Sequence, residues 1–249
     1  MAVRVERRAE TLVITIDRPA KHNALDQDAR LTITNALRTA ADDPTVRVIV
    51  LTATGDRTFC AGMDLTVDSD EVDPTNNPLR VLGPRYPKPV IAALNGSALG
   101  NGLEIALKCD LRVAVDTARL WLPEVGLGFA ATDGGVSLPK YLPMAVALEL
   151  GLGAGRLTAQ RAFDLGLINR VVPVGQALEA ALELAALVAK GSPVAIRATR
   201  ELMYASVDLP DDDFEALMKQ RQAELMAGPD SAEGVAAFNE KREPVWPSR

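Results

Sequence analysis

The sequence predicts an α/β fold whose C-terminal part is helical. Up to about residue 140, short β-branched runs alternate with segments whose apolar residues recur at helical spacing. Such strand–helix–strand alternation is typical of parallel sheets with right-handed crossovers. Beyond residue 140 the pattern becomes mainly helical. The chain has 249 residues, 48% of them apolar, and is long enough to bury a substantial core.

The predicted strands lie in the first half of the chain. The run "TLVITI" at 11–16 ends at the turn "DRPAKHN". The run "VRVIVLT" at 46–52 is continuously β-branched, as expected of a strand buried on both faces. Similar runs occupy 89–95 and 111–115, with a short helix expected between them. Apolar residues at helical spacing predict a further helix over 26–41.

Capping residues mark the helices of the second half. In "LTAQRAFDLG", Thr158 is the predicted N-cap and Gly166 the stop signal. In "SPVAIRATRELMY", Ser192 is the N-cap and Pro193 the first helical residue. Further helices are predicted over 178–190, over 211–227 and over "SAEGVAAFNEKR", the last capped by Ser231. The chain therefore divides into an αβ core, residues 1–190, and a helical region, residues 191–249.

Composition excludes several functional classes. A net charge of −6 and a pI of about 5.0 argue against a nucleic-acid partner. Cys60 and Cys109 have no neighbours at metal-ligand spacing, and His22 is the sole histidine, so we expect inert thiols and no metal site. The N-terminus has no apolar signal core, and no run reaches the ~20 apolar residues of a membrane span. We therefore expect a cytoplasmic protein with no membrane partner.

Two glycine-rich turns are the candidate functional segments. One is "FCAGMDL" at 59–65, and the other is "NGSALGNGLEIALKCD" at 95–110. Glycines let backbone N–H groups come close to a ligand, and a helix N-terminus adds unpaired donors. Two such N–H groups that converge on one carbonyl oxygen form an oxyanion hole. An ordinary tight turn explains either segment taken alone.

Two isolated carboxylates accompany these turns. Glu104 lies among apolar neighbours in the expected short helix, and Glu124 follows 20 positions later in "LWLPEVGLG". A paired acid and base can move protons on and off a substrate carbon and a water. A surface pair, or a Glu104 that only favours a helix N-terminus, would explain the same spacing.

Together these segments resemble the crotonase, or enoyl-CoA hydratase/isomerase, superfamily. The resemblance covers nearly the whole chain in the family's order through "RPAKHNAL", "FCAGMDL", "PVIAALNGSALGNGLEIALKCDLRVA", "LPEVGLG", "AFDLGLINRVVP" and "EGVAAFNEKR". It implies a crotonase-like ββα superhelix core, with residues 191–249 as a helical trimerisation region. It also implies an acyl-CoA substrate, no cofactor beyond that coenzyme A, and a homotrimer or dimer of trimers.

The resemblance also implies roles for individual residues. The two hydratase glutamates of the family correspond to Glu104 and Glu124, and the two oxyanion-hole amides to Met63 and Asn101. The remaining implied contacts with coenzyme A or substrate are Lys21, Ala24, Ala61, Asp64, Leu65, Gly100, Trp121, Thr132 and Lys241. Lys241 matches a position that reaches CoA phosphates, across a subunit boundary in some arrangements. An exposed helix lysine is the alternative interpretation of Lys241, and a solvent-facing residue that of His22.

The sequence departs from the family pattern in three places. Asn101 stands where glycine is common, although the backbone N–H that the hole needs is still present. Trp121 stands where a small residue is common, so it either narrows the acyl pocket or packs in the core. The segment "GFAATDGGVSLP" differs from the usual sequence of the family. Thr132 aligns with a position that supplies an extra acid in some relatives, and Asp133 is its neighbour. Asp133 is either a turn residue or an acid that redirects the chemistry.

The leading functional hypothesis is an enoyl-CoA hydratase. An isomerase of this family often keeps only the acid at the Glu124 position, so Glu104 favours hydration. The alternatives are an isomerase, a specialised dehydratase, a hydrolase, or a non-catalytic acyl-CoA-binding protein. Acyl chain length, pathway and the division of labour between the two glutamates stay open at this point.

Overall fold

The structure, a computed structural model, describes residues 2–66 and 75–248. The main sheet contains β1 (Val3–Arg8), β2 (Thr11–Ile16), β3 (Val48–Ala53), β5 (Val90–Leu94), β7 (Leu111–Val115) and β10 (Arg170–Val172). These strands lie in the order β1-β2-β3-β5-β7-β10. β1 and β2 are antiparallel, and the other neighbours are parallel, as the alternating sequence pattern predicts.

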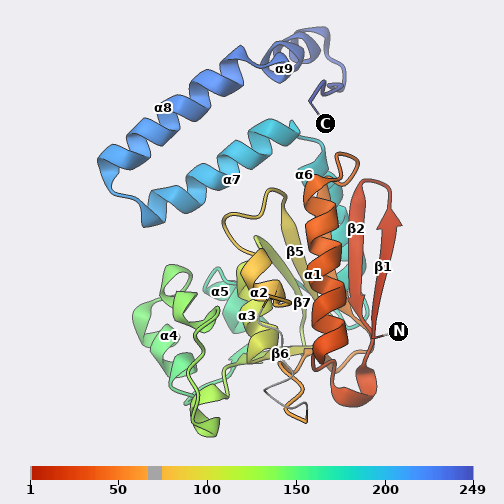
Figure 1. Cartoon of the computed structure of the whole chain (residues 1–249), viewed down its shortest axis with the longest axis vertical. Coiled ribbons are helices and arrows are strands. Elements are labelled where there is room, and N and C mark those ends of the chain that lie inside the picture. The colour runs from red at the N-terminus through yellow and green to blue at the C-terminus, as the bar shows by residue number, and fades with distance from the viewer. Residues whose placement is uncertain (1, 67–74, 249) are drawn as a thin grey trace.

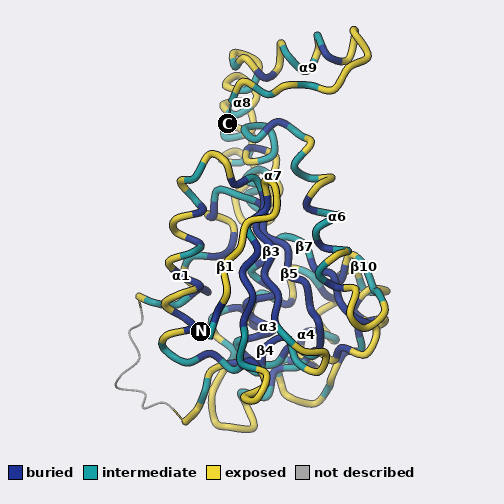
Figure 2. The backbone as a smooth tube through the Cα atoms, turned by 90° about the vertical axis from the view of Figure 1, so that its right-hand side faces the viewer, coloured by how far each residue is buried: buried dark blue, intermediate teal, exposed yellow. Residues whose placement is uncertain are grey.

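Helices cover both faces of the main sheet. α1 (Gln27–Asp42) packs on β1 and β2, and α6 (Ala177–Ala189) packs on β3, β5 and β7. Figure 2 shows α1 and α6 on opposite sides of the buried strands. β3 and β5 are buried along their whole length, which explains their continuous apolar sequences.

A smaller sheet carries the candidate functional segments. It contains β4 (Thr58–Cys60), β6 (Ser97–Leu99), β8 (Arg119–Trp121) and β9 (Leu157–Thr158), in that order. β4, β6 and β8 are parallel, and β9 runs antiparallel to β8. α3 (Asn101–Lys108) follows β6 directly and packs on β4 and β6. Short helices around the sheets are α2 (Pro78–Val81), α4 (Met144–Gly151), α5 (Ala159–Asp164), η1 (Pro19–Lys21), η3 (Glu124–Leu127) and η4 (Gly135–Lys140), where η denotes a 3₁₀-helix.

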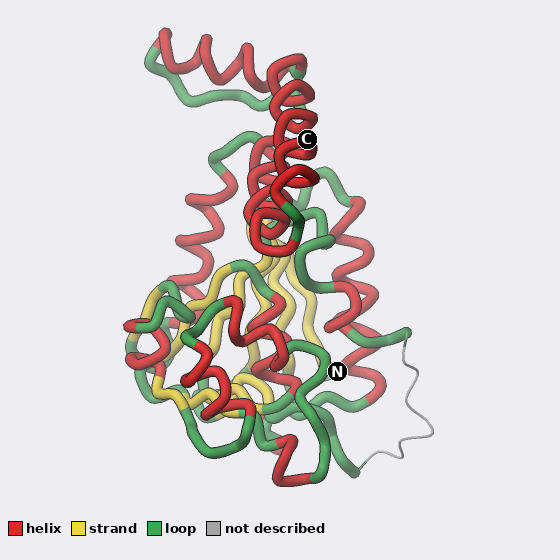
Figure 3. Tube along the Cα trace, turned by 90° about the vertical axis from the view of Figure 1, so that its left-hand side faces the viewer, coloured by secondary structure: helices red, strands yellow, loops and turns green. Residues whose placement is uncertain are grey.

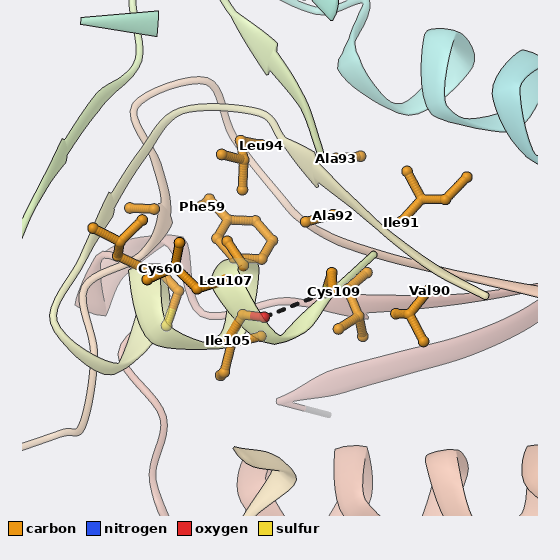
Figure 4. Close-up of a cluster of buried hydrophobic side chains, with 14 of the residues drawn as sticks. Phe59, Cys60, Val90, Ile91, Ala92, Ala93, Leu94, Ile105, Leu107 and Cys109 are labelled. Carbon is orange, nitrogen blue, oxygen red and sulfur yellow. Dashed lines mark hydrogen bonds between the residues drawn. The ribbon is translucent and has the colours of Figure 1, made fainter. Parts of the chain in front are cut away.

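Phe59 of β4 joins the small sheet to the rest of the core. Its ring is fully buried and lies near Leu94 of β5 and near Cys60 (Figure 4). Cys109 belongs to the same cluster, where its thiol donates to the carbonyl of Ile105. Burial raises the pKa of the Cys60 thiol to about 12 and also raises the pKa of Cys109. Both thiols are therefore un-ionised at neutral pH, which agrees with the prediction of inert cysteines.

α3 and the small sheet approach each other through glycine. A Cβ on Gly102 would overlap the carbonyl group of Cys60, and a Cβ on Gly96 would overlap the backbone at Arg57 and Thr58. The start of α3 can lie directly against the end of β4 because position 102 has no side chain.

The C-terminal helices form an arm beyond one end of the main sheet. α7 (Pro193–Asp208) packs on α8 (Asp211–Ala227), and α8 packs on α9 (Pro229–Glu240). Figures 1 and 3 show this arm apart from the sheets and from α3. Every residue of α8 is half-buried or exposed. The exposed large apolar side chains of the arm are Met203, Val207, Leu209, Met218, Met226, Val235 and Phe238. Oligomerisation through residues 191–249 would cover this surface, and it stays a prediction.

Arg200 fastens the arm to the core. Its guanidinium pairs with Asp110 at 2.6 Å and donates to the carbonyl oxygens of Gly83, Pro84 and Tyr86. Asp110 immediately precedes β7, and its second oxygen accepts from the amide that opens β5 at 2.8 Å. One side chain of α7 is thereby linked, through Asp110, to the starts of β5 and β7.

The predicted strands and helices are confirmed. Most of their ends shift by no more than two residues, whereas α7 continues to Asp208, four residues beyond the predicted segment, and α9 begins earlier than predicted. The predicted cap of the last helix is wrong. α9 begins at Pro229 after Gly228, because proline suits the first helical position, and Ser231 instead donates to the carbonyls of Met226 and Gly228. β1 is not among the predicted strands because its residues after Val3 are exposed and mostly charged. Within the described ranges, no helix is long and apolar enough to cross a membrane.

Replacing Arg200 by methionine should lower the free energy of unfolding by about 3 kcal/mol, because Asp110 would keep its charge in a partly buried site without its cation. Urea denaturation measures this change. Arg197→Met is the matched control, since Arg197 is exposed on the same helix. Equal stability losses in the two variants would contradict the anchoring role of Arg200.

Candidate active site

Two neighbouring strand ends bring the two predicted amides together. β4 ends at Cys60 and β6 at Leu99, and because these strands are parallel, the segments after them leave the same edge of the sheet. Gly62 has a φ of +97°, and a Cβ there would lie 3.4 Å from the amide nitrogen of Asn101. The turn that contains Met63 therefore lies directly beside the first residue of α3.

The amide N–H groups of Met63 and Asn101 are both available as donors. Neither donates to an acceptor within residues 2–66 and 75–248. Asn101 is the first residue of α3, where the helix itself supplies no acceptor. Gly100, which precedes it, has φ +50° and ψ −130°, a conformation that favours glycine. The geometry is that of two unpartnered donors at one edge, as an oxyanion hole requires.

Glu104 is buried and held by three donors. Its side chain lies in the first turn of α3 and the residue is 1% exposed. Oε1 accepts from the amides of Gly134 at 2.8 Å and Gly135 at 2.9 Å. Oε2 accepts from the side-chain amide of Asn101. These three contacts, two to Oε1 and one to Oε2, hold the carboxylate group in one orientation.

The glycine pair at 134–135 is required for this contact. A Cβ on Gly134 would lie 2.8 Å from Cβ of Glu104 and 3.0 Å from its Cα. A Cβ on Gly135 would lie 2.8 Å from Cδ1 of Leu122. Sequence analysis gives these glycines only a place in a turn. The sequence signal for this contact is the Gly-Gly pair shortly after Glu124. Its partner, Glu104, lies 30 positions before Gly134, so the contact is visible only in the folded chain.

Glu124 has the opposite environment. It opens η3, three residues after the end of β8, and a Cβ on Gly100 would lie 2.8 Å from its Oε1. Its Oε2 is buried and has no hydrogen-bond partner in the described part of the chain. Burial raises the pKa of Glu124, and the negative charge of Glu104 raises it further. A carboxyl group whose pKa is raised in this way is suited to hold and deliver a proton.

The implied CoA contacts near the N-terminus lie on one surface. The backbone of the 18–25 turn is bonded to the segment after β4: the amide of Ala61 donates to His22, that of Leu25 to Gly62, and that of Asp64 to Leu25. This pairing brings together Lys21, Ala24, Ala61, Asp64 and Leu65. Of these, Lys21 and Leu65 are exposed, and His22 is exposed as well.

Arg18 and Asn23 hold this turn, and sequence analysis does not single them out. Arg18 pairs with Asp26 at 2.8 Å and with Asp64 at 3.1 Å, and it donates to the carbonyl of Ala24. Buried Asn23 donates to the carbonyls of Thr54, just after β3, and Thr58, the first residue of β4, and it accepts from the amide of Arg18. Because Asp64 accepts from the hydroxyl and amide of Thr66 as well as from Arg18, its pKa falls to about 2. Its side chain is thus engaged in holding the turn, and its backbone is what remains for a ligand.

Three predicted residues, Trp121, Thr132 and Lys241, make no hydrogen bond to either glutamate in the described part of the chain. The ring of Trp121 packs under the guanidinium of Arg156 at 4.5 Å, in a hollow that contains neither glutamate. Thr132 is exposed, two residues before Gly134. Lys241 ends α9 in a left-handed conformation, and Figure 1 shows α9 far from α3. Their roles toward substrate stay predictions, and that of Lys241 requires another subunit.

Asp133 lies between Thr132 and the glycine pair at 134–135. Its carboxylate accepts a hydrogen bond from Asn77, the N-cap of α2, at 3.4 Å, and the next residue, Gly134, binds Glu104. This placement agrees with a turn residue and also leaves an acid one residue from a donor to Glu104.

A hollow of about 800 Å³ lies elsewhere, between α7, α8 and the loop at 84–87. It contains Arg200 but neither glutamate and neither of the two free amides. This hollow is therefore separate from the candidate site with its two amides and two carboxyl groups.

Comparisons with known proteins identify the family of this chain. Residues 6–249 match the family model described as enoyl-CoA hydratase/isomerase. The chain belongs to the enoyl-CoA hydratase/isomerase family. It is 35% identical to a carnitinyl-CoA dehydratase of Salmonella heidelberg, over 100% of this chain and 99% of that protein.

Solved structures of this family also match over the whole chain. An enoyl-CoA hydratase of Bacillus anthracis superposes with a TM-score of 0.92 at 31% identity and 100% coverage of both chains. An enoyl-CoA hydratase of Mycobacterium tuberculosis H37Rv superposes with a TM-score of 0.92 at 35% identity, covering 100% of this chain and 99% of that one. The predicted crotonase-type α/β fold is therefore confirmed, and the chain is an enzyme of the crotonase superfamily.

Replacing Gly134 by alanine should lower the free energy of unfolding by about 1–3 kcal/mol, since the added methyl group collides with the backbone and Cβ of Glu104. Thermal or urea unfolding measures the loss. Gly151→Ala serves as control, because a Cβ there meets nothing within 4 Å. If Gly134→Ala is as stable as the control, the close approach of 134 to Glu104 is wrong.

Replacing Glu124 by glutamine should stabilise the protein at neutral pH. The raised pKa of Glu124 means that ionisation costs more in the folded than in the unfolded state, so the wild type loses stability as pH rises through that pKa. Glutamine does not ionise. The melting temperature of Glu124→Gln should therefore exceed that of the wild type at about pH 7 and match it at about pH 4, where Glu124 is protonated. A difference that is independent of pH would contradict the raised pKa.

Proposed function

We propose that this chain is an enoyl-CoA hydratase, which adds water reversibly across the 2,3 double bond of an enoyl-CoA thioester. The observation that carries the proposal is a carboxylate held by three donors, Glu104, beside a desolvated carboxyl, Glu124, at the edge where two free amides meet. Membership of the enoyl-CoA hydratase/isomerase family supports an acyl-CoA substrate.

The two free amides activate the thioester. The amides of Met63 and Asn101 donate to its carbonyl oxygen, which gains negative charge as the enolate forms. Removing one such donor in comparable sites costs about 10²–10³ in rate. The oxyanion hole therefore contributes as much to the rate as the proton transfers do. Both donors are backbone N–H groups, so they do not require a particular side chain.

The different environments of Glu104 and Glu124 suit them to different proton transfers. Glu104 accepts a proton from water, and the water oxygen bonds to C3. The electrons of the C2–C3 double bond move toward the thioester oxygen, and C2 then takes the proton of Glu124. The product is a 3-hydroxyacyl-CoA, with the proton now on Glu104, and exchange with solvent restores the starting state. The raised pKa of Glu124 supports its role as the acid.

Coenzyme A lies across the surface formed by the 18–25 turn and the segment after β4. Lys21, Ala24, Ala61 and Leu65 are accessible or half-buried there, and Arg18 fixes their arrangement. In a homotrimer or dimer of trimers, Lys241 of another subunit would add a cation for the phosphates.

Asp133 favours a second candidate, the dehydration of a specialised 3-hydroxyacyl-CoA. Its carboxylate lies one residue from a donor to Glu104, and a relative at 35% identity is named carnitinyl-CoA dehydratase. The chemistry is the same reaction in reverse on a different acyl group. Under the first candidate, Asp133→Asn leaves hydration of a simple enoyl-CoA unchanged.

Glutamine substitution tests the two-carboxylate mechanism. Glu104→Gln and Glu124→Gln should each lower kcat for hydration of crotonyl-CoA by about 10²–10⁴-fold, because each removes one proton transfer. The loss of enoyl-thioester absorbance measures the rate, and Asp133→Asn is the matched control. Turnover that survives both glutamine substitutions would refute the mechanism, and a wild type that binds but never hydrates would point to the second candidate or to a binding protein.

A further inference from the structure

Asn101 contacts both halves of the site through different atoms. Its backbone N–H is one of the two free amides, and its side-chain Nδ2 donates to Oε2 of Glu104. The residue is the first of α3, so its carboxamide spans one turn of the helix to reach the glutamate. Glycine at this position would supply the same backbone donor and no side-chain contact.

The hydrogen-bond capacity of Glu104 is nearly filled. A carboxylate offers about four lone-pair sites, and the amides of Gly134 and Gly135 occupy Oε1 while Asn101 occupies one site of Oε2. A single site on Oε2 is left. That site can accept from one O–H group and no more.

We propose that the Asn101 carboxamide is a positioning residue, which orients Glu104 so that its one remaining lone pair faces the attacking water. The proposal rests on the hydratase function above. Without Nδ2, Oε2 has two open sites, and the carboxylate can turn about the axis fixed by the Gly134 and Gly135 amides. Water then binds Glu104 in orientations that do not point at C3 of the substrate.

The backbone N–H and the side-chain Nδ2 of Asn101 therefore act in different steps of the reaction. The backbone N–H stabilises the enolate, a step that needs the hole and Glu124. The carboxamide affects only the addition of water, a step that needs Glu104. A saturated thioester such as butyryl-CoA has no double bond to hydrate, but its α-proton can pass to Glu124 and return as deuterium in D₂O through the same enolate.

The experiment compares Asn101→Ala and Asn101→Gly with the wild type in two assays. We expect kcat for hydration of crotonyl-CoA to fall about 10- to 100-fold, as for a misoriented base, with KM within about threefold. We expect the rate of α-hydrogen exchange on butyryl-CoA, followed by NMR in D₂O, to stay within about threefold. The exchange assay also reports that the variants are folded and that their backbone donors are in place.

Asn101→Asp distinguishes the donor from the shape of the side chain. Aspartate is isosteric but donates no hydrogen bond and places a second negative charge against Glu104, so hydration should fall further than in Asn101→Ala. A purely steric role predicts instead that Asn101→Asp outperforms Asn101→Ala.

Two results would overturn the positioning role while the hydratase function stands: hydration at the wild-type rate in Asn101→Ala and Asn101→Gly, or equal losses of hydration and exchange in both. Absence of hydration in the wild type would instead refute the proposed function, and the positioning role with it.

Discussion

The site depends on one backbone contact, the approach of Gly102 at the start of α3 to the carbonyl of Cys60 at the end of β4. Any Cβ at position 102 would overlap that carbonyl group. A separation of α3 from β4 would move the amide of Asn101 away from the turn that carries Met63. It would move Glu104 as well, since Asn101 and Glu104 both lie in α3. Small displacements matter in such sites because a misplacement of about 1 Å can cost a factor of ~10² in rate.

Two side chains of the same type have different properties at this edge because the fold partners them differently. Glu104 has three donors, two of them backbone amides that come close only through Gly134 and Gly135. Glu124 has a buried oxygen with no partner in the described ranges, and its pKa is raised by burial and by the charge of Glu104. Environments that separate the proton affinities of two carboxyls are a general way to obtain an acid and a base from one residue type.

Much of the fold follows from local sequence patterns, because the buried strands and capped helices carry their signals within a few residues. β3 and β5 are continuous apolar runs, and Ser192 and Thr158 cap their helices as expected. The cap at Ser231 fails because two candidate starts, Pro229 and Ser231, lie two residues apart and proline takes the first helical position.

The site is less accessible to sequence reasoning, because its determining contacts join distant segments. The glutamates stand out as isolated acids, but the partners of Glu104 at 134–135 and the anchoring of the N-terminal turn by Arg18 appear only in the folded chain. The side chain of Asn101 is a similar case: its spacing from Glu104 permits the contact, and the geometry of α3 makes it.

The most direct test of this account is a crystal structure of the protein with 3-hydroxybutyryl-CoA bound. We expect the thioester oxygen to lie about 2.7–3.1 Å from the amide nitrogens of both Met63 and Asn101. We also expect the 3-hydroxyl group to lie against Oε2 of Glu104 and C2 to face Glu124. A thioester oxygen bound away from these two amides, or a hydroxyl group that contacts neither glutamate, would contradict it.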